Sequence, residues 1–356
     1  MTDREQPEPA SSGQTRLLVV IPTLNEERHI EALLRGLLAE ARDSAWLAMT
    51  ISVVDGGSTD STCAIVRSLM LEAEQIKLLH NRARIQSTSV NLAVRRFGDA
   101  AEVLIRCDAH ATYPEAYCTR LVQTLSRVGA DSVVVPMDSV GERGLQRAVA
   151  WLSNSALGTG GAAHRGGRSS GFVDHGHHAA FSMSFFRRVG GYDETFTHNE
   201  DAELDCRQRA LGARIYLDSD IRIEYRPRAN LRALWAQYFN YGVGRSRTAR
   251  RHPHSLRFRQ MALPANLALS VLALSVSPYS TVFLCWPLLY LAVLVAASLR
   301  IAIHHRALLG LLAAPAAFTM HVAWAAGFFR GLWGHRERVW QREMAVPLAV
   351  AEVDRG

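Results

Sequence analysis

The sequence contains no aspartate, glutamate, lysine or arginine between positions 260 and 299, although charged residues make up 21% of the whole chain. An uncharged, largely apolar run of this length exceeds a core helix of a soluble domain and approaches two membrane spans of about 20 residues each. A third apolar segment follows, interrupted by Pro315 and His321. We therefore predict membrane-anchoring helices at 261–277, 281–299 and 307–329, with a buried helical bundle as the alternative.

The sequence also lacks a basic motif interleaved with aromatic residues, so its formal net charge of +7 does not indicate nucleic-acid binding. The positive charge is concentrated just before the apolar block. Basic residues are enriched on the cytoplasmic side of membrane spans, so this position is typical of a cytoplasmic segment beside a span. These residues are Arg222, Arg226, Arg228, Arg232, Arg245, Arg247, Arg250, Arg251, Arg257 and Arg259. Three full spans would place the basic tail after residue 329 on the opposite side, so a re-entrant or interfacial position for one segment stays open.

Paired cysteine spacing and a signal peptide are absent as well. The five scattered cysteines are typical of reduced thiols, so we predict a cytosolic catalytic domain at the inner (cytoplasmic) membrane. Residues 1–14 are polar and include Pro7 and Pro9. We expect residues 1–15 to form a disordered leader rather than a targeting signal.

Before the apolar block, short apolar runs alternate with helical patterns. The strand-like runs are 17–21, 50–54, 76–79, 103–107 and 132–136. Alternation at this spacing predicts an α/β domain with a mostly parallel, Rossmann-like sheet. Asn25 is expected to cap the first helix, and either Ser58 or Asp60 the second.

Ligands of such sheets bind beyond the carboxyl ends of the strands. The loop at 22–26 follows the first strand, Asp55 ends the second, and Asp108 follows a later one. A further acidic group lies at 199–203. Acidic side chains at such positions can hold a nucleotide, a divalent metal and a proton, so the pattern predicts an enzyme.

Order and spacing of the motifs resemble family 2 glycosyltransferases of the GT-A fold, over about residues 16–250. The motifs are Val20-Ile21-Pro22-Thr23-Leu24-Asn25-Glu26-Glu27, Val54-Asp55-Gly56-Gly57-Ser58-Thr59-Asp60, Asp108-Ala109-His110 and Asn199-Glu200-Asp201-Ala202-Glu203-Leu204-Asp205-Cys206-Arg207. Further runs are similar to glucosyltransferases of succinoglycan-type exopolysaccharide pathways. These runs are Phe172-Val173-Asp174, Gly190-Gly191-Tyr192-Asp193-Glu194 and Tyr241-Gly242-Val243-Gly244-Arg245.

The resemblance implies a UDP-sugar site at the ends of the first two strands. The residues that would grip the ribose and base are Pro22, Thr23, Asn25 and Glu26. Asp55 would accept a hydrogen bond from the uracil N3–H. Arg84 matches a basic position near the base in relatives, although an ordinary exposed arginine is equally expected. Asp60 is either part of this site or only a helix cap.

The resemblance also implies a divalent cation, because the departing diphosphate must be neutralised. Asp108 is the expected ligand and donor contact. The family usually has Asp-x-Asp, whereas this chain has His110 at the third position. Imidazole suits Mn²⁺ better than Mg²⁺, so we predict Mn²⁺ or Mg²⁺ held by Asp108 and His110.

Glu200-Asp201 matches the family's Glu-Asp pair, in which the aspartate is the general base of an inverting transfer. We predict that Asp201 takes the proton of the acceptor hydroxyl and that Glu200 binds substrate. Asn199 is expected to cap the helix that carries both. The neighbouring carboxylates that compete for these roles are expected to be solvated or structural: Asp193, Glu194, Glu203 and Asp205.

Three other features leave alternatives. The run 175–178 contains three histidines but no zinc-like spacing, so we predict that it lines the acceptor pocket rather than binding zinc. The glycine-rich segment 156–171 is either a surface linker or a mobile active-site lid. Gln237 and Arg245 lie where processive relatives carry Gln-x-x-Arg-Trp, and the broken pattern favours addition of a single sugar.

The sequence thus predicts an inverting, metal-dependent glycosyltransferase that transfers one sugar, with glucose expected, from a UDP-sugar to a lipid-linked saccharide in exopolysaccharide biosynthesis. The alternatives are a processive polysaccharide synthase and a non-catalytic membrane scaffold that retains a nucleotide-binding fold. The expected divisions are a leader at 1–15, the GT-A domain at 16–250, anchoring helices at 251–335 and a tail at 336–356.

Overall fold

The computed structural model describes residues 13–159, 169–334 and 336–349. Most of the predicted leader lies outside these residues. The centre of the glycine-rich segment, with His164, Arg165 and Arg168, lies outside them too, so the choice between linker and lid stays open.

An eight-stranded sheet forms the centre of the catalytic domain, in the order β3-β2-β1-β4-β8-β5-β9-β7. Its strands are β1 (Thr15–Thr23), β2 (Leu47–Asp55), β3 (Ile76–His80), β4 (Val103–Arg106), β5 (Ser132–Val135), β7 (Gly171–Phe172), β8 (His177–Ser182) and β9 (Ile215–Leu217). The first four strands pair in parallel, as predicted, whereas β8 runs antiparallel between β4 and β5. A second sheet pairs β6 (Met137–Ser139) with β10 (Ile223–Tyr225) in parallel.

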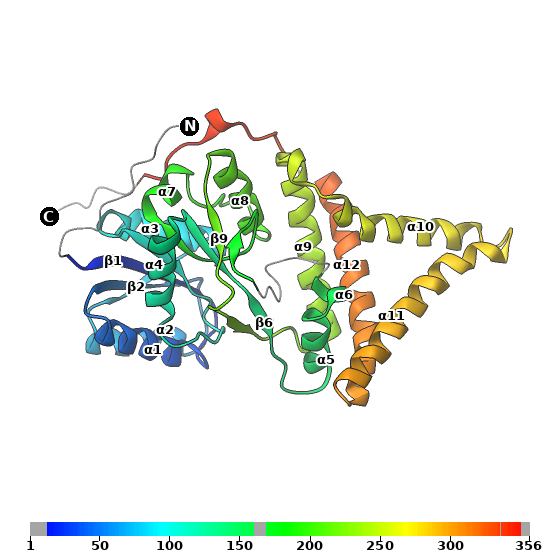
Figure 1. Ribbon diagram of the computed structural model, residues 1–356, viewed down its shortest axis with the longest axis horizontal. Helices are drawn as coiled ribbons and strands as arrows, with labels where there is room; N and C mark the ends of the chain where they lie inside the picture. The colour runs from blue at the N-terminus through cyan, green and yellow to red at the C-terminus, as the bar shows by residue number, and fades with distance from the viewer. Residues whose placement is uncertain (1–12, 160–168, 335, 350–356) are drawn as a thin grey trace.

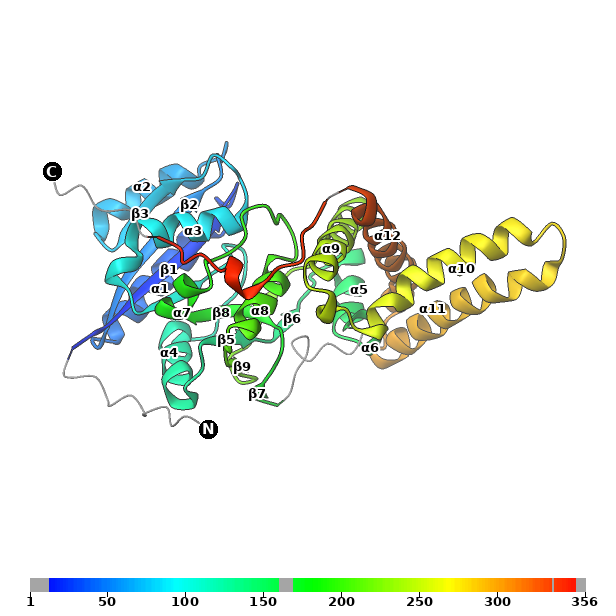
Figure 2. The same ribbon diagram turned by 90° about the horizontal axis from the view of Figure 1, so that it is seen from above.

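Helices cover both faces of the large sheet (Figures 1 and 2). One face carries α1 (Ile30–Asp43), α2 (Thr62–Glu72) and α4 (Tyr117–Val128), and the other α3 (Gln86–Phe97), α7 (Met183–Arg188) and α8 (Glu200–Ala210). Successive β1 side chains point to opposite faces, so Val19 packs into one layer and Val20 into the other. Burial on both faces explains why this strand is a continuous apolar run.

Of the predicted helix caps, Asn25 is wrong, and Asn199 has the predicted position without a side-chain cap hydrogen bond. Helix α1 begins at Ile30, because Asn25 adopts a left-handed backbone with φ 57° and remains in the loop. Asn199 precedes α8, but its side chain makes no cap hydrogen bond. The Asn199 side chain instead donates to Thr248 Oγ1 at 2.9 Å. Asn25 therefore lies in a loop, whereas Asn199 occupies the cap position of α8 and its side chain connects this helix to α9.

A helical layer follows the sheet domain (Figures 1 and 2). It contains α5 (Gly144–Ser153), α6 (Ala156–Thr159), α9 (Leu231–Arg251) and α12 (Ala313–Gly334), while α10 (Ala262–Val276) and α11 (Cys285–His304) project away from it. Short 3-10 helices are η1 (Gly98–Ala100), η2 (Pro253–Ser255), η3 (Phe258–Met261), η4 (Thr281–Leu284), η5 (Leu308–Leu312) and η6 (Arg342–Met344). Three stretches are long and apolar enough to cross a membrane: Phe258–Val276, Thr281–His304 and Leu308–Gly334. The three predicted apolar helices are therefore present.

Glycines let α9 and α12 touch backbone to backbone. A Cβ atom on Gly242 would lie 2.0 Å from the carbonyl oxygen of Trp324, and one on Gly327 would lie 1.9 Å from that of Phe239. No side chain larger than hydrogen fits at such separations. Helix α9, at the expected end of the GT-A domain, is thus tightly packed against one of the three apolar helices.

Candidate active site

The carboxyl ends of β1, β2 and β4 meet at one edge of the sheet. Thr23 ends β1 and pairs in register with Asp55, which ends β2, and β4 lies on the other side of β1. Asp108 follows β4 and lies at the same edge. Thr23 is buried, and its hydroxyl donates to the Ile21 carbonyl at 2.9 Å, while the intervening Pro22 is partly buried. The structure therefore brings the three predicted strand ends together.

Asp55 is a buried carboxylate that orders the turn after β2. It accepts hydrogen bonds from the backbone N–H groups of Gly57 at 2.8 Å and Ser58 at 3.1 Å. Burial by itself would raise the pKa of Asp55, but the hydrogen bonds from Ser58 and Gly57 outweigh it and hold the pKa below its ordinary value. Asp55 is consequently an ionised acceptor at neutral pH.

The loop after β1 is bound to the loop after β2. The backbone N–H of Asn25 donates to Ser58 Oγ, and its side-chain oxygen accepts from the N–H of Thr59, both at 2.8 Å. The N–H of Glu26 donates to Thr62 Oγ1, also at 2.8 Å. Asn25 and Glu26 therefore share one wall of the site with the Asp55 turn.

Asp60 and Arg84 both lie beside this wall. The Asp60 carboxylate accepts from the N–H of Thr62, the first residue of α2, at 3.0 Å and from that of Glu27 at 3.2 Å. This position supports the helix-cap interpretation. Arg84 is exposed, and a Cβ on Gly57 would lie 3.1 Å from its guanidinium, so the arginine covers the Asp55 turn.

Asp108 lies between a glutamine and a histidine. Gln86 Nε2 donates to one carboxylate oxygen at 3.0 Å, and His177 Nε2 lies 3.9 Å from the other. Burial would raise the pKa of Asp108, but the positive charge of Arg106 lowers it below its ordinary value. Burial and the same arginine lower the pKa of His177 to about 4, so its imidazole is neutral at pH 7.

His110 is oriented by Glu26. Its Nδ1 lies 2.8 Å from the Glu26 carboxylate, and this hydrogen bond raises the pKa of His110 above its ordinary value. A carboxylate partner of this kind is a common way to fix a metal-binding imidazole. Within the described residues, no three side chains of the histidine, cysteine, aspartate or glutamate types are grouped to hold a metal ion. Asp108 and His110 therefore supply suitable donor atoms but not a complete site by themselves.

Asp201 forms a buried ion pair that the sequence did not predict. Arg106 Nη1 donates to Asp201 Oδ1 at 2.8 Å and Nη2 to Oδ2 at 3.2 Å, while the Tyr192 hydroxyl donates to Oδ1 at 2.8 Å. Burial would raise the pKa of Asp201, but the charge of Arg106 holds it far below its ordinary value. Asp201 is thus ionised and rigidly oriented.

Glu200, at the first position of α8, has the opposite electrostatic character. Burial, followed by the negative charge of Asp201, raises the pKa of Glu200 to about 7. Two adjacent carboxylates whose environments push their pKa values apart are a frequent arrangement in acid–base sites. The structure therefore provides two candidate proton acceptors for one reaction.

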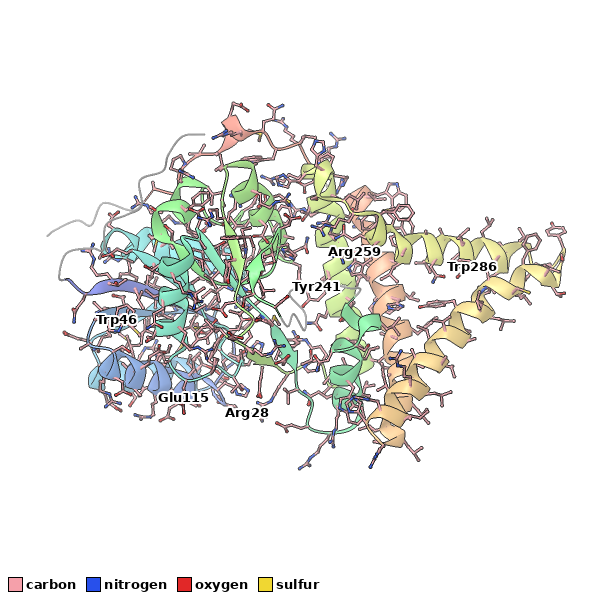
Figure 3. All side chains as sticks on the ribbon, in the orientation of Figure 1. Arg28, Trp46, Glu115, Tyr241, Arg259 and Trp286 are labelled. Atoms are coloured by element: carbon pink, nitrogen blue, oxygen red, sulfur yellow. The ribbon has the colours of Figure 1, made fainter. Side chains whose placement is uncertain are left out.

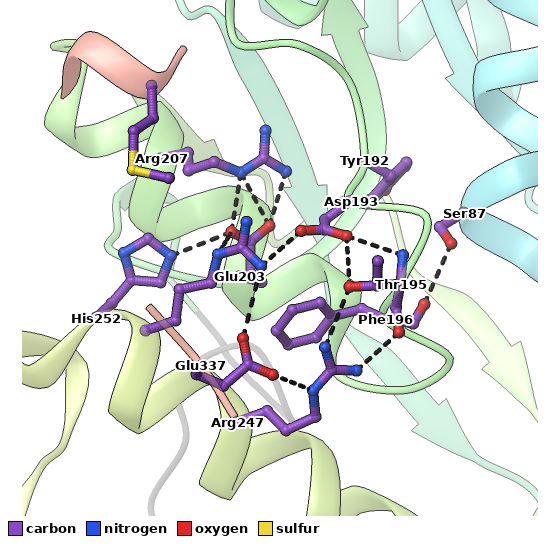
Figure 4. A network of polar contacts seen from close by, with 12 residues as sticks. Ser87, Tyr192, Asp193, Thr195, Phe196, Glu203, Arg207, Arg247, His252 and Glu337 are labelled. Atoms are coloured by element: carbon purple, nitrogen blue, oxygen red, sulfur yellow. Dashed lines mark hydrogen bonds and ion pairs between the residues drawn. The ribbon is translucent and has the colours of Figure 1, made fainter. Parts of the chain in front are cut away.

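The competing carboxylates Glu203 and Asp193 belong to a structural network with basic residues (Figure 4). Glu203 has no exposed surface and pairs with Arg207 at 2.7 Å, with Arg251 at 3.4 Å and with His252 at 3.1 Å. Asp193 pairs with Arg251 at 2.6 Å. The structural alternative for these carboxylates is supported, and the solvated alternative is wrong for Glu203.

The histidine run 175–178 has a different role at each histidine. His175 and His178 each lie 2.5 Å from an oxygen of the buried Asp205, which makes Asp205 structural. His177 alone faces the site, with Nδ1 3.4 Å from Arg106. The run shows no zinc-type cluster among the described residues, and only His177 lies where a pocket-lining role applies.

Gln237 and Arg245 are occupied by contacts within the chain. Gln237 Nε2 donates to the hydroxyls of Tyr225 at 2.7 Å and Tyr241 at 3.0 Å. The buried Arg245 donates to Ser255. Both side chains therefore have hydrogen-bond partners within the chain.

The roles of Arg106, Tyr192 and Gln86 were not predicted from the sequence, and His177 was predicted only as one member of the histidine run. Arg106 could have been noticed in the sequence, because it interrupts the apolar run of β4. The structure shows that its side chain is buried. A buried arginine needs a buried partner of opposite charge. Tyr192 and Gln86 carry no local signal, since tertiary contacts alone bring them to Asp201 and Asp108.

Comparison with known proteins identifies the family. Residues 18–190 match the family described as glycosyl transferase family 2. The chain is also 43% identical over 329 residues to the succinoglycan biosynthesis protein ExoA of Rhizobium meliloti (strain 1021), covering 91% of this chain and 97% of that protein. The chain belongs to glycosyltransferase family 2.

The fold of this glycosyltransferase is also found among solved structures. A mannosyltransferase, PcManGT from Pyrobaculum calidifontis, determined with GDP-Man and Mn²⁺, superposes with a TM-score of 0.61 at 18% identity. The superposition covers 93% of this chain and 92% of that one. The GT-A fold with C-terminal apolar helices, predicted from the sequence, is therefore confirmed.

Proposed function

We propose that this glycosyltransferase inverts the anomeric centre while it transfers one sugar from a UDP-sugar, with glucose expected, to a lipid-linked saccharide in exopolysaccharide biosynthesis. One observation carries the proposal. Asp55 and Asp108, on the expected donor side, lie at one sheet edge, and Arg106 links that edge to Asp201 on the expected acceptor side. The near full-length similarity to a succinoglycan biosynthesis protein supports the pathway class.

The donor nucleotide would lie along the wall formed by the loops after β1 and β2. The ionised Asp55 would accept the uracil N3–H, because a carboxylate accepts but does not donate. Arg84, which covers the Asp55 turn, would contact the base from the solvent side. Pro22, Thr23, Asn25 and Glu26 complete the expected donor contacts.

Asp108 and His110 would hold a divalent cation, Mn²⁺ or Mg²⁺, against the diphosphate. When bound, the cation would neutralise charge that develops on the departing UDP. One carboxylate and one imidazole are donors that Mn²⁺ accepts. The mannosyltransferase of similar fold was itself determined in complex with Mn²⁺, which supports this choice of metal.

Asp201 would accept the proton of the attacking hydroxyl. Its bidentate contact with Arg106 keeps it ionised and directs it, and Glu200 would bind the acceptor beside it. A base works best with a pKa near the working pH, so Glu200, with its pKa of about 7, is the rival for this role.

The acceptor would be held at the inner membrane, with the catalytic domain in the cytosol. Three apolar helices are candidate spans, and a lipid-linked saccharide cannot leave the bilayer. Processive synthesis is disfavoured because Gln237 and Arg245 are occupied within the chain. A scaffold without activity would not need the paired carboxylates of α8.

The proposal is tested by measuring UDP release from UDP-glucose and other nucleotide sugars, with membranes that contain lipid-linked saccharides. We expect release to depend on both acceptor membranes and the full-length enzyme, with one sugar added per acceptor. Products carrying many added sugars would indicate a synthase. Absence of release with every donor would support the scaffold.

A further inference from the structure

Both ends of α12 are held by the catalytic domain. Before α12, His305 stacks on Trp151 of α5 with ring centroids 4.1 Å apart. After α12, Glu337 pairs with Arg247 of α9 at 2.5 Å, and the N–H of Trp340 donates to the carbonyl of Arg251 at 2.9 Å. The chain therefore leaves the catalytic domain before α10, returns to it before α12 and remains in contact with it after α12.

The tail beyond Trp340 stays with the catalytic domain. The backbone N–H of Leu348 donates to the carbonyl of Arg187 in α7 at 2.8 Å. The Leu348 side chain packs on the apolar cluster between the sheet and α3, α7 and α8. These contacts cannot form across a bilayer, so the tail and the catalytic domain lie on the same side of any membrane.

Helix α12 lies alongside α9 over most of its length (Figures 1 and 2). The contacts at Gly242 and Gly327 are continued at Gly331, where a Cβ would lie 2.8 Å from Ser246, and Arg250 donates to the Gly331 carbonyl at 2.7 Å. Helix α9 carries the arginines Arg232, Arg245, Arg247, Arg250 and Arg251. Charged side chains of this number are excluded from the hydrocarbon core, so α9, and α12 with it, lie outside that core.

The composition of α12 fits the membrane–water interface. Trp324, Phe329, Arg330 and Trp333 lie in its second half, and Trp333 is 78% exposed. Tryptophan and arginine are favoured where apolar and aqueous phases meet. In Leu308–Gly334 39% of the most apolar window is buried in protein, against 11% in each of the other two candidate spans.

Among the helices that the structure describes, α10 and α11 alone stand away from the protein with exposed apolar surfaces (Figure 3, near Trp286). With 15 and 20 residues they extend about 22 and 30 Å at 1.5 Å per residue, so α11 matches the bilayer core of about 30 Å and α10 alone is shorter. The apolar stretch that contains α10, Phe258–Val276, has 19 residues. Their connection, 277–280, carries no charge, whereas Arg257 and Arg259 precede the hairpin and Arg300 and Arg306 lie at its end.

We propose that α10 and α11 enter the lipid bilayer as one hairpin and that α12 lies in the membrane surface on the side of the catalytic domain. This inference rests on the membrane attachment that is part of the proposed function. It places every basic cluster, including Arg336 and Arg338 of the tail, on one side of the membrane. The conflict between three spans and the charge bias then disappears, because α12 is not a span.

The test uses the full-length enzyme in membrane vesicles of both orientations, with the exposed Cys285 replaced by serine. Single cysteines are placed at three exposed positions: Glu115 in the catalytic domain, Tyr279 at the hairpin tip and Arg338 in the tail. A membrane-impermeant maleimide is added to each variant. The Cys285→Ser parent without a new cysteine is labelled in parallel, to correct for labelling of the four remaining native cysteines. None of the three side chains belongs to the proposed catalytic or donor site.

We expect Glu115→Cys and Arg338→Cys to be labelled in the same vesicle orientation, and Tyr279→Cys to be protected or labelled only in the other. Labelling of Arg338→Cys in the opposite orientation to Glu115→Cys would establish three spans and overturn the proposal. Labelling of Tyr279→Cys together with Glu115→Cys would overturn insertion of the hairpin. Recovery of the full-length chain in the soluble fraction would instead remove the membrane attachment itself, and UDP release would show whether transferase activity survives.

Discussion

The substitution Asp201→Asn replaces a carboxylate by an amide of the same size. It removes both the proposed proton acceptor and the negative charge that pairs with Arg106. A general base contributes about 10²–10⁴-fold to a rate, so we expect at least a hundredfold loss of transfer. The Arg106 side chain is only 3% exposed. Removal of one partner from a buried ion pair costs about 3–5 kcal/mol, which is large beside a typical unfolding free energy of about 5–15 kcal/mol. A loss of activity alone therefore cannot identify the base.

The matched control is the double variant Arg106→Gln/Asp201→Asn, which removes both charges together. The large cost of breaking a buried pair comes from the unpaired charge that is left, so the double variant, which leaves none, should regain part of the thermal stability that Asp201→Asn loses. The assay combines melting curves, UDP affinity by calorimetry and UDP release with acceptor membranes. We expect the double variant to bind UDP like the parent and to remain inactive in transfer.

Recovery of transfer to within about threefold of the parent would refute the base role, since a base cannot be removed at so small a cost. Asp201 would then act only as the partner of Arg106. Glu200→Gln is measured beside it. Collapse of transfer in that variant alone, with UDP affinity unchanged, would assign the base to Glu200.

Three further predictions concern the metal, the pH dependence and the helical layer. Asp108→Ala should abolish Mn²⁺-stimulated transfer and weaken Mn²⁺ binding in calorimetry, and full activity of the parent enzyme in excess chelator would contradict metal dependence. His110→Asp should remain active and use a broader range of metals. An unchanged metal profile of this variant would exclude His110 as a ligand. Because burial raises the pKa of Glu200 from 4.5 to about 7, the folded chain holds an extra proton in that window and loses stability as pH rises through it. Glu200→Gln should therefore gain melting temperature over the parent as pH increases across this window, and a constant difference would refute the shift. Gly242→Ala should destabilise the chain by about 1–3 kcal/mol through overpacking, measured by thermal unfolding, whereas Gly36→Ala, with open space around it, should not.

The first strands and the positions of their polar ends could be predicted from sequence because they depend on local patterns. Apolar runs buried on both faces mark β1 and β2, and glycines after Asp55 mark the turn that its carboxylate orders. The antiparallel strand β8 could not be predicted in the same way, since its pairing with β4 depends on a chain reversal far along the sequence.

The acceptor side of the site was predicted less completely. Asp201 is marked by its motif, but its partner Arg106 lies 95 residues earlier in sequence, and no local pattern connects them. Glu203 resembles a solvated helix residue in sequence, yet it is fully buried beside Arg207. Substitution of Glu203 would disturb folding, so Glu203→Gln is a poor control for Asp201→Asn. An exposed residue such as Glu72 is a better position for a control substitution.

The expected domain boundary at residue 250 remains a prediction. The apolar packing of the helical layer continues across this boundary. Helices α5 and α9 share one apolar cluster with α11 and α12, including Leu152, Leu234, Ile301 and Ala316. A chain cut near residue 250 would expose the apolar faces of α5 and α9 to water. Local composition changes at that point, but the tertiary packing continues across it.

The contacts of the tail set an order of assembly during synthesis. Glu337 and Leu348 are translated after the hairpin, yet Glu337 completes the ion pairs around Arg247 and Leu348 packs on the core beside α7 and α8. When every strand of the sheet has been translated, the nascent chain still lacks these last contacts. The enzyme therefore completes its packing around α7, α8 and α9 only after α10 and α11 have been made, which ties completion of the sheet domain to synthesis of the apolar helices.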